Sequence, residues 1–521
     1  MWGLKRRLAA AVIGLGLLSG LPTAAEAKWL QAETARFTLY SNGSEQKLRE
    51  YAVKLEDFDT LLRVFFALDP NGVPARKLEI YLVNDSVDMR RVWPGASESL
   101  AGFYTASSYN IFAIGKRDGG RSDSDSDDTI LHEYSHHFMM QYLKGRYPGW
   151  LIEGFAEYYM TAKLKPGSFE IGSFNTGRAY TLMNGDWTPT EAVLTKRTGE
   201  LKGSQVFGYY AQSWLMTHYM LSDPARRKQL FTYVRLLGQG KESVAAWVEA
   251  TGQSIEAFDA RLKAYMKSNL VSTRFTRPNY KPAPVSVTVM PKSADDLLLE
   301  SLRAIQSGCG AIRDSDDDDD EEDEEKKDKA KEERERAAFL ARVRERAARY
   351  PGDGLADRTL ACVELRFGDK DAGMAILDRM IAAEQPDADA LRIKADVLLA
   401  QAREDTADDA RDDLMDAAGR LLLKANAARP NEYRTLLSYA RSRQGERDYP
   451  NDNVLDVLHN AVALAPQVDD VRIEAARALM MRRRWDEAEP LLIPVANNPH
   501  GGAGAAIARA MLKEIERARG G

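Results

Sequence analysis

Three histidines lie within nine residues of this chain, in the segment ILHEYSHHF at 130–138. The whole sequence of 521 residues contains only six histidines, so half of them are gathered here. On an α-helix, residues four apart lie on the same face, one turn above each other. His132 and His136 could therefore present ring nitrogens to a single metal ion. His137 is rotated by about 100° from His136 on such a helix and is not expected to be a ligand.

The order His132-Glu133-x-x-His136 is the HExxH pattern of helix-borne zinc sites in peptidases. Zinc held by two imidazoles needs a further protein ligand and keeps one position for water. Glu133 follows the first histidine directly and would act toward that water as general base and then as general acid. The pattern alone leaves open the alternative of a helix that carries histidines on one face without a metal.

A candidate third ligand lies in the segment GWLIEGFAEYY at 149–159, which is predicted to form the next helix. Glu153 and Glu157 are four residues apart and therefore share one face of that helix. The sixteen residues between His136 and Glu153 suffice to end the first helix, turn through GRYPG and return antiparallel. The spacing therefore brings a carboxylate within reach of the two histidines.

The stretch WLIEGFAEYY is similar to the WLNEGFA stretch of the aminopeptidases, and residues 128–160 resemble the gluzincin zinc peptidases. This resemblance implies that Glu153 is the third zinc ligand, beside His132 and His136. It also implies that Glu157 hydrogen-bonds a zinc-bound histidine and orients it. The interval between the ligands is slightly shorter here than in the aminopeptidases, which leaves the subfamily open.

The order of elements over 30–270 is also similar to that of bacterial exported, peptidase-MA-like domains. In those domains a tyrosine on a later helix is in the position of a residue whose hydroxyl stabilises the oxyanion, and the similarity implies the same role here. The candidates here are Tyr209 and Tyr210, and Tyr210, directly before Ala-Gln-Ser-Trp, fits better. An ordinary aromatic core contact is the alternative for either residue. The resemblance further implies that substrate binds along an edge strand within 102–114.

Hydrophobic periodicity predicts the elements that must position these residues. A long helix is expected at 45–67, between strands at 37–40 and 78–83, and a pair of strands at 102–104 and 110–114. Asp127 or Asp128 could cap the helix that carries HEYSH, Gly145 would end it, and Pro148 would begin the next helix. The stretch 166–206 is predicted to be rich in loops, followed by helices at 207–221, 226–237 and 241–268.

From about residue 285 the pattern changes, first to the extended, proline-marked link KPAPVSVTVMP and then to nearly continuous helical periodicity. A period of about 34 residues with helix–turn–helix units is typical of tetratricopeptide repeats. The stretch 360–386 resembles that family closely, whereas an unrelated helical bundle is the alternative. Prolines mark the period at intervals of 35, 44, 36 and 33 residues, at Pro351, Pro386, Pro430, Pro466 and Pro499.

Residues 314–325, DSDDDDDEEDEE, hold eleven acids in twelve positions. Such a run cannot bury apolar surface and its charges repel one another, so 313–333 is predicted to be a disordered insertion. The formal charge of −6 is therefore a local feature of the chain. No basic stripe points to nucleic acid or to a membrane surface as a partner.

The first 27 residues have the pattern of a secretory signal peptide. Three basic residues precede an apolar stretch from Leu8 to about Leu21, and Ala25-Glu-Ala27 supplies a cleavage signal. The apolar stretch is shorter than a stable membrane anchor needs. We therefore expect a periplasmic or secreted protein, in which Cys309 and Cys362 could pair or remain unpaired and buried.

Together these features predict a signal peptide at 1–27, an α+β zincin-like peptidase domain at 28–284 and an all-α helical-repeat domain at 285–521. The expected activity is hydrolysis of peptide bonds by a water that bound Zn²⁺ activates. The repeats would bind a protein partner or position the polypeptide substrate. The alternative is a catalytically inactive scaffold of peptidase fold, whose repeats mediate protein–protein interaction.

Overall fold

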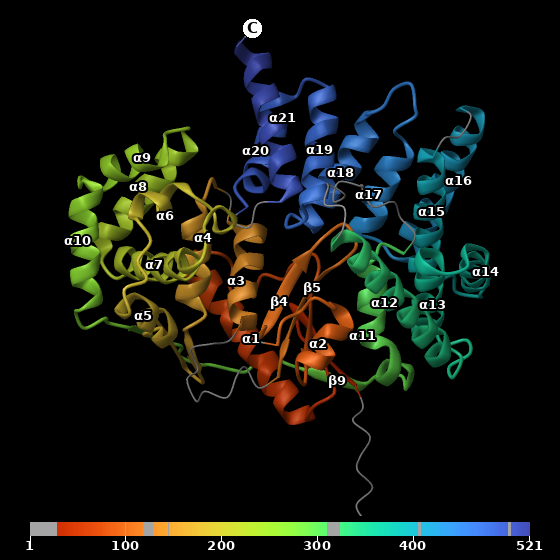
Figure 1. Ribbon diagram of the computed structural model, residues 1–521, viewed down its shortest axis with the longest axis horizontal. Coiled ribbons are helices and arrows are strands. Elements are labelled where there is room, and N and C mark those ends of the chain that lie inside the picture. Colours follow the sequence, from red (N-terminus) through yellow and green to blue (C-terminus); the bar gives the residue numbers. More distant parts are fainter. Residues whose placement is uncertain are drawn as a thin grey trace, which may run out of the picture.

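The computed structural model of the protein describes most of the chain after its N-terminal segment (Figure 1). The predicted signal peptide at 1–27, the predicted caps Asp127 and Asp128, and Pro499 lie outside the described residues. The same holds for residues 310–323, which include most of the acidic run. The described residues are 29–98, 100–117, 129–143, 145–309, 324–404, 408–498 and 502–520.

A six-stranded mixed sheet forms the centre of an N-terminal α/β region, with the strand order β4-β5-β3-β2-β1-β9. Strands β2, β3 and β5 are parallel, whereas β4, β1 and β9 pair antiparallel with their neighbours. The strands predicted at 37–40, 78–83, 102–104 and 110–114 are all confirmed. The sheet comprises β1 (Leu30–Glu33), β2 (Phe37–Ser41), β3 (Leu78–Val83), β4 (Gly102–Ala106), β5 (Ile111–Lys116) and β9 (Ser286–Val289).

Helices cover both faces of this sheet. Alternate residues of β3 point to opposite faces, as a strand requires, with Ile80 on one side and Tyr81 on the other. The Ile80 side packs against α1 (Glu45–Phe65) and α3 (Thr129–Tyr142). The Tyr81 side packs against α2 (Ser86–Val92) and α11 (Ser293–Gln306). The helix α3, which carries HEYSH, is thus held against the sheet beside β4 and β5.

The segment near residue 285 is not a link between domains. It forms β9, which pairs with β1 so that Val289 lies opposite Leu30, and it leads directly into α11 on the sheet. The predicted extended conformation is therefore confirmed for Ser286–Val289, whereas the prediction of a link is wrong, because this strand completes the edge of the sheet.

A lobe of helices follows α3 and has its own apolar core, which includes Trp150, Trp214 and Trp247. The stretch 166–206 contains one strand and several short helices, so the expectation of a loop-rich segment is wrong in part. The helix predicted at 241–268 is two helices, because Gly252 ends the first with φ 69° and Ser254 caps the second. The lobe comprises α4 (Gly149–Tyr159), β6 (Lys163–Lys165), β7 (Ser168–Ile171), α5 (Thr176–Met183), α6 (Thr190–Thr195), η1 (Thr198–Glu200), α7 (Ser204–Leu221), α8 (Pro224–Gly238), α9 (Ser243–Thr251), α10 (Ile255–Met266) and β8 (Thr273–Thr276).

The C-terminal region is all-helical in its described part and consists of stacked helix pairs. Pro351, Pro386, Pro430 and Pro466 lie in the connections that separate successive pairs, which confirms their use as repeat markers. Helix pairs α13–α14, α15–α16, α17–α18 and α19–α20 pack within themselves and against their neighbours. The helices are α12 (Glu324–Ala347), α13 (Gly354–Phe367), α14 (Lys370–Ile381), α15 (Ala388–Arg403), α16 (Asp408–Ala428), α17 (Tyr433–Ser442), α18 (Asp452–Leu464), α19 (Asp469–Met481), α20 (Trp485–Ala496) and α21 (Ala503–Gly520).

Two further features of this region bear on the sequence predictions. Helix α12 begins at Glu324, so the predicted disorder of 313–333 is wrong for 324–333, where basic residues alternate with the acids. Cys309 and Cys362, whose state was open, form a disulfide bond that joins the end of α11 to α13. None of the described helices is both long and apolar enough to cross a membrane.

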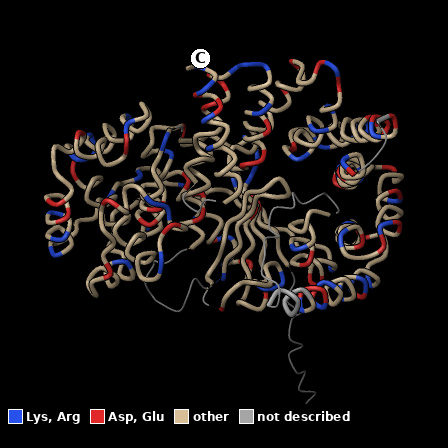
Figure 2. The backbone as a smooth tube through the Cα atoms, turned by 45° about the horizontal axis from the view of Figure 1, so that its top comes forward, with Lys and Arg blue, Asp and Glu red and all other residues tan. Residues whose placement is uncertain are grey.

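The helical region curves around the sheet and returns to the α/β region (Figure 1). Residues of α17, α18 and α19 share one continuous apolar core with α1, α3 and the sheet. Polar contacts reinforce this interface, since the Tyr433 hydroxyl donates to the Ser107 carbonyl over 2.7 Å and Gln467 donates to the Gln141 side chain. Charged residues of both signs are interspersed along the helices, whereas the central strands carry few (Figure 2). The two regions therefore form one packed body.

Candidate metal centre

The candidate metal centre lies between α3 and α4. Helix α3 is anchored by the face opposite its first histidine, where Leu131, Tyr134 and Phe138 enter the apolar core. The buried Tyr134 hydroxyl donates a hydrogen bond of 2.5 Å to the Asp59 carboxylate on α1. This face sets the rotation of α3, so that His132 and His136 turn toward α4.

Helix α4 is apolar on nearly all sides, which is typical of a buried helix. Trp150 packs into the core of the helical lobe, while Phe155 and Tyr159 pack into the core around the sheet. Gly154 allows α7 to approach closely, because a Cβ at this position would overlap Thr217 Oγ1 and the Ser213 carbonyl. The sequence of α4 therefore places its two glutamates inside the protein.

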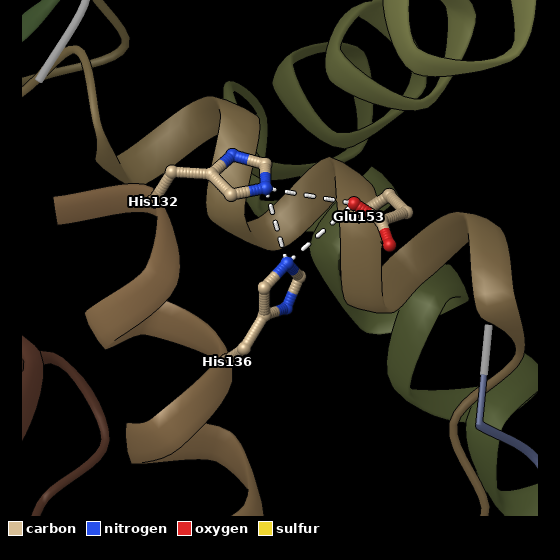
Figure 3. A group of neighbouring side chains, drawn as sticks. All are labelled: His132, His136 and Glu153. Atoms are coloured by element: carbon tan, nitrogen blue, oxygen red, sulfur yellow. Dashed lines mark hydrogen bonds and ion pairs between the residues drawn. The ribbon is translucent and has the colours of Figure 1, made fainter. Parts of the chain in front are cut away.

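His132, His136 and Glu153 converge on one point (Figure 3). The two Nε2 atoms are 3.1 Å apart, and Glu153 Oε2 lies 3.7 Å from His132 Nε2 and 3.5 Å from His136 Nε2. A zinc ion at its usual bond lengths in a tetrahedral site would separate its ligand atoms by about 3.3 Å. The three side chains therefore already have the spacing of three ligands around one ion.

Glu157 lies one turn beyond Glu153 and faces the other side of the first histidine. Its Oε1 atom is 3.5 Å from His132 Nδ1, the nitrogen that points away from Glu153. Arg178 on α5 holds Glu157 through two parallel contacts, from Nε over 2.8 Å and from Nη2 over 2.5 Å. Asn175, which caps α5, donates to the same carboxylate over 3.3 Å. The orientation of His132 thus depends on α5 as well as on α4.

Burial shifts the acid–base properties of the groups at this centre. It lowers the pKa of His132 to about 4, with the neighbouring His136 adding to the effect, so that this imidazole is neutral at pH 7. Burial also raises the pKa of Glu133 to about 7, against the attraction of His136 and with the repulsion of Glu153. A neutral imidazole can bind a metal, and a carboxylate with a pKa near 7 can exchange protons at neutral pH.

The two tyrosine candidates have different environments. Tyr209 is fully buried in the core of the helical lobe, and its hydroxyl donates to the Lys196 carbonyl over 3.3 Å. Tyr210 is half-buried, and its ring lies 5.1 Å from the Arg178 guanidinium. Burial raises the pKa of Tyr210, and the charges of Glu153 and Glu157 raise it further. Tyr209 is therefore a core residue, whereas Tyr210 belongs to the surroundings of the candidate centre.

His137 is not part of this centre, in agreement with the sequence prediction. It is buried on another face of α3, where Nδ1 hydrogen-bonds the Tyr104 hydroxyl over 3.0 Å. Its other ring nitrogen lies 3.4 Å from Gln467 of the helical region. The third histidine of the motif therefore belongs to the interface between the two regions.

Sequence reasoning missed Arg178 and Asn175. Both lie about twenty residues after Glu157, in a stretch without periodicity, and only the fold of the chain brings α5 to the end of α4. Asn175 is the N-cap of α5, and its side chain accepts a hydrogen bond from the backbone N–H of Arg178, which has no partner within the first turn of the helix. A helix-capping asparagine in the sequence was the available signal, but it does not indicate the contact with Glu157.

Comparisons with known proteins do not identify the family of this chain. No protein-family model matches the sequence, and no curated protein matches it. Among solved structures, a thermophilic TPR protein of Thermus thermophilus is similar to part of the chain, with a TM-score of 0.30 and 18% sequence identity. The match covers 34% of this chain and 90% of that protein. The repeat character of the C-terminal region therefore rests on its own helix pairs.

Proposed function

We propose that the protein is an exported zinc metallopeptidase of gluzincin type, with a zincin-like α+β domain. The observation that carries this proposal is the convergence of His132, His136 and Glu153 at ligand spacing, with Glu133 next to them on α3. An accidental HExxH sequence would not require a buried glutamate from another helix at the same point. It would also not require a second buried carboxylate behind the first histidine.

In this proposal, each residue of the site has a separate role in peptide hydrolysis. Zinc bound by the three ligands would polarise a water molecule and lower its pKa to about 7. Glu133 takes a proton from the attacking water and delivers it to the leaving amine. The Tyr210 hydroxyl donates a hydrogen bond to the peptide carbonyl oxygen as negative charge develops on it. Glu157, held by Arg178, keeps His132 in the orientation that binds the metal.

The test combines metal analysis with cleavage of an unfolded polypeptide by the purified full-length protein. We expect one zinc per chain and cleavage that a chelator abolishes. Glu133→Gln should retain zinc but lose activity by at least about 100-fold, because a general base contributes that much or more. The exposed Glu50→Gln on α1 serves as a matched control and should cleave like the wild type. Absence of zinc after purification without chelators would refute the site, and zinc with no cleavage would favour the inactive scaffold.

For the helical region we propose binding of a protein partner or of the polypeptide substrate. Stacked helix pairs provide extended surfaces that suit a polypeptide ligand. The region is fixed to the α/β region through a shared core, so a polypeptide bound on it would be held at a set position relative to α3 and α4. Crosslinking of an inactive Glu133→Gln protein to an unfolded substrate tests this, since crosslinks to α13–α16 are expected.

Export is part of the same proposal. The sequence pattern of residues 1–27 supports it, and so does the disulfide bond between Cys309 and Cys362, because disulfides persist in oxidising compartments. Fractionation of cells that produce the protein should place it outside the cytoplasm, with its N-terminus after Ala27. Retention in the cytoplasm at full length would contradict export without affecting the metal centre.

A further inference from the structure

A cavity of about 580 Å³ lies between the two regions of the protein, at the C-terminal end of α3. Its walls come from the end of α3, the connection to α4, and helices α18 to α20. Cavities of 300 to 1,000 Å³, in round numbers, are typical of sites for small organic ligands. The position is distinct from the candidate metal centre, whose ligands do not line the cavity.

The lining of this cavity is mostly apolar. Met139 of α3, Leu143 just after this helix, Val462 of α18 and Leu491 of α20 line it, and further methionine, proline and isoleucine side chains complete the walls. Methionine side chains are flexible and fill irregular spaces, so such a wall can adapt to an aliphatic or aromatic ligand. The apolar walls therefore favour a ligand with an apolar body.

The charged groups of the lining all have the same sign. Arg146 and Arg472 line the cavity together with His459, and no aspartate or glutamate is among the described residues that do so. Neither arginine has a carboxylate within ion-pair distance in the described part of the chain. The cavity therefore combines an apolar wall with an excess of positive charge, which would attract an anion.

Arg472 is the strongest indication of a ligand. Its side chain is only 8% exposed, and its Nε donates to the Pro466 carbonyl. Asp469, one turn earlier on α19, attracts the guanidinium at longer range but forms no ion pair with it. A buried guanidinium without a paired acid is costly and is usually matched by an anion. Its planar donors suit a carboxylate, which can accept two parallel hydrogen bonds.

We propose that this cavity binds a small anionic amphiphile, with its carboxylate on Arg472 and its apolar body between α3 and the helices α18 and α20. The proposal does not depend on the metal centre or on peptidase activity. Because the ligand would touch the connection between α3 and α4 as well as the helical region, its binding would add a further contact between the two regions.

Calorimetric titration of the full-length protein with decanoate, below its micelle concentration, tests the proposal. Decan-1-ol has the same chain without the charge and serves as the ligand control. We expect decanoate to bind at one site and decan-1-ol to bind at least about tenfold more weakly, since a hydrogen bond to a charged group is worth that factor or more.

Variants of the protein separate the two parts of the site. Arg472→Gln should weaken decanoate binding at least about tenfold, whereas Arg403→Gln, an exposed arginine on α15, should leave it unchanged. Ala463→Phe fills the cavity from an exposed position of α18 and should abolish binding without disturbing the core, which keeps the test valid if Arg472→Gln fails to fold. Absence of decanoate binding by the wild type, equal binding of decan-1-ol, or binding unchanged in Ala463→Phe would overturn the proposal.

Discussion

Two clusters of buried charge lie in the same α/β region, and their charge balance differs. Around Asp59, two acids meet two arginines. Arg36 contacts both Glu56 and Asp59, and Arg63 contacts Asp59 over 2.5 Å. All four side chains are nearly inaccessible to solvent. Between α3 and α4, by contrast, three carboxylates lie near two histidines, and the one arginine there, Arg178, pairs with Glu157.

This difference separates a structural cluster from a candidate metal site. Buried ion pairs are stable only when each charge finds a partner, and the Asp59 cluster meets that requirement within the chain. The cluster that contains Glu133, Glu153 and Glu157 has more acid than base, and its two histidine nitrogens face an acid at ligand spacing. A divalent cation would correct this imbalance. The first three of the following predictions test the contrast between the two clusters, and the fourth extends it to a third cluster.

The largest effect is expected from removing one charge of the balanced cluster. Asp59→Asn leaves Arg36 and Arg63 buried with a single acid, and loss of one partner of a buried pair costs about 3–5 kcal/mol. Urea unfolding monitored by circular dichroism measures this loss. Tyr134→Phe removes only one hydrogen bond to the same carboxylate and should cost about 1 kcal/mol. An unchanged unfolding free energy for Asp59→Asn would remove the basis of the comparison.

The opposite behaviour is expected at the candidate metal centre, where substitution of a ligand should affect zinc binding more than stability. Glu153→Gln should lower zinc affinity by at least about 100-fold, because a ligand with a charge is replaced by a neutral amide. The unfolding free energy of the metal-free protein should change by less than about 1 kcal/mol, since the substitution removes an acid from an acid-rich cluster. Zinc titration and urea unfolding in a chelator measure the two quantities. A large loss of metal-free stability would place Glu153 with the structural acids instead.

A smaller effect is expected for Arg178, which in the proposed zinc site would act on the metal only through Glu157 and His132. Arg178→Gln should lower zinc affinity by about 10- to 100-fold, as is usual when a group that orients a ligand is lost. Arg274→Gln removes an exposed arginine paired to Glu170 and is the matched control. If both variants bind zinc equally well, Arg178 has only a structural role.

The smallest effect concerns a third cluster, in the helical region. Burial alone would raise the pKa of Glu432, but Arg434 and Arg76 hold this pKa at about 2. The folded pKa is below the unfolded one, so the contribution of Glu432 is present above pH 4.5 and is lost as the pH falls toward 2. Glu432→Gln should cost about 1–2 kcal/mol at pH 7 and about nothing at pH 2, by urea unfolding. A cost independent of pH would contradict the ion pair.

Much of the local structure was predictable because its signals are periodic. Strands β2, β3, β4 and β5, helix α1 and the helices that carry HEYSH and WLIEGFAEYY follow from patterns of apolar residues with period two or near four. The four proline markers that the structure describes fall in connections between helix pairs, as their spacing indicates. Most errors occurred where short elements dominate, at 166–206, at Gly252 and at β9, because a few residues carry too little periodicity to be recognised. The predicted disorder of 324–333 was wrong for another reason, since the charged residues at the start of α12 form no apolar pattern.

The sequence by itself determined which residues of α3 and α4 could act together. His132 with His136, and Glu153 with Glu157, are paired by the geometry of a helix, which needs no information from the rest of the chain. Helix periodicity also excluded His137 from the ligands.

Only the tertiary structure decided what surrounds these pairs. It separated the buried Tyr209 from Tyr210, brought Arg178 to Glu157, and joined Cys309 to Cys362. It also placed α18 to α20 against α3, where they enclose the cavity that holds Arg472. No periodic pattern in the sequence links the residues that each of these contacts brings together. They form because apolar faces must be buried against each other, and that packing is settled only when the whole chain has folded.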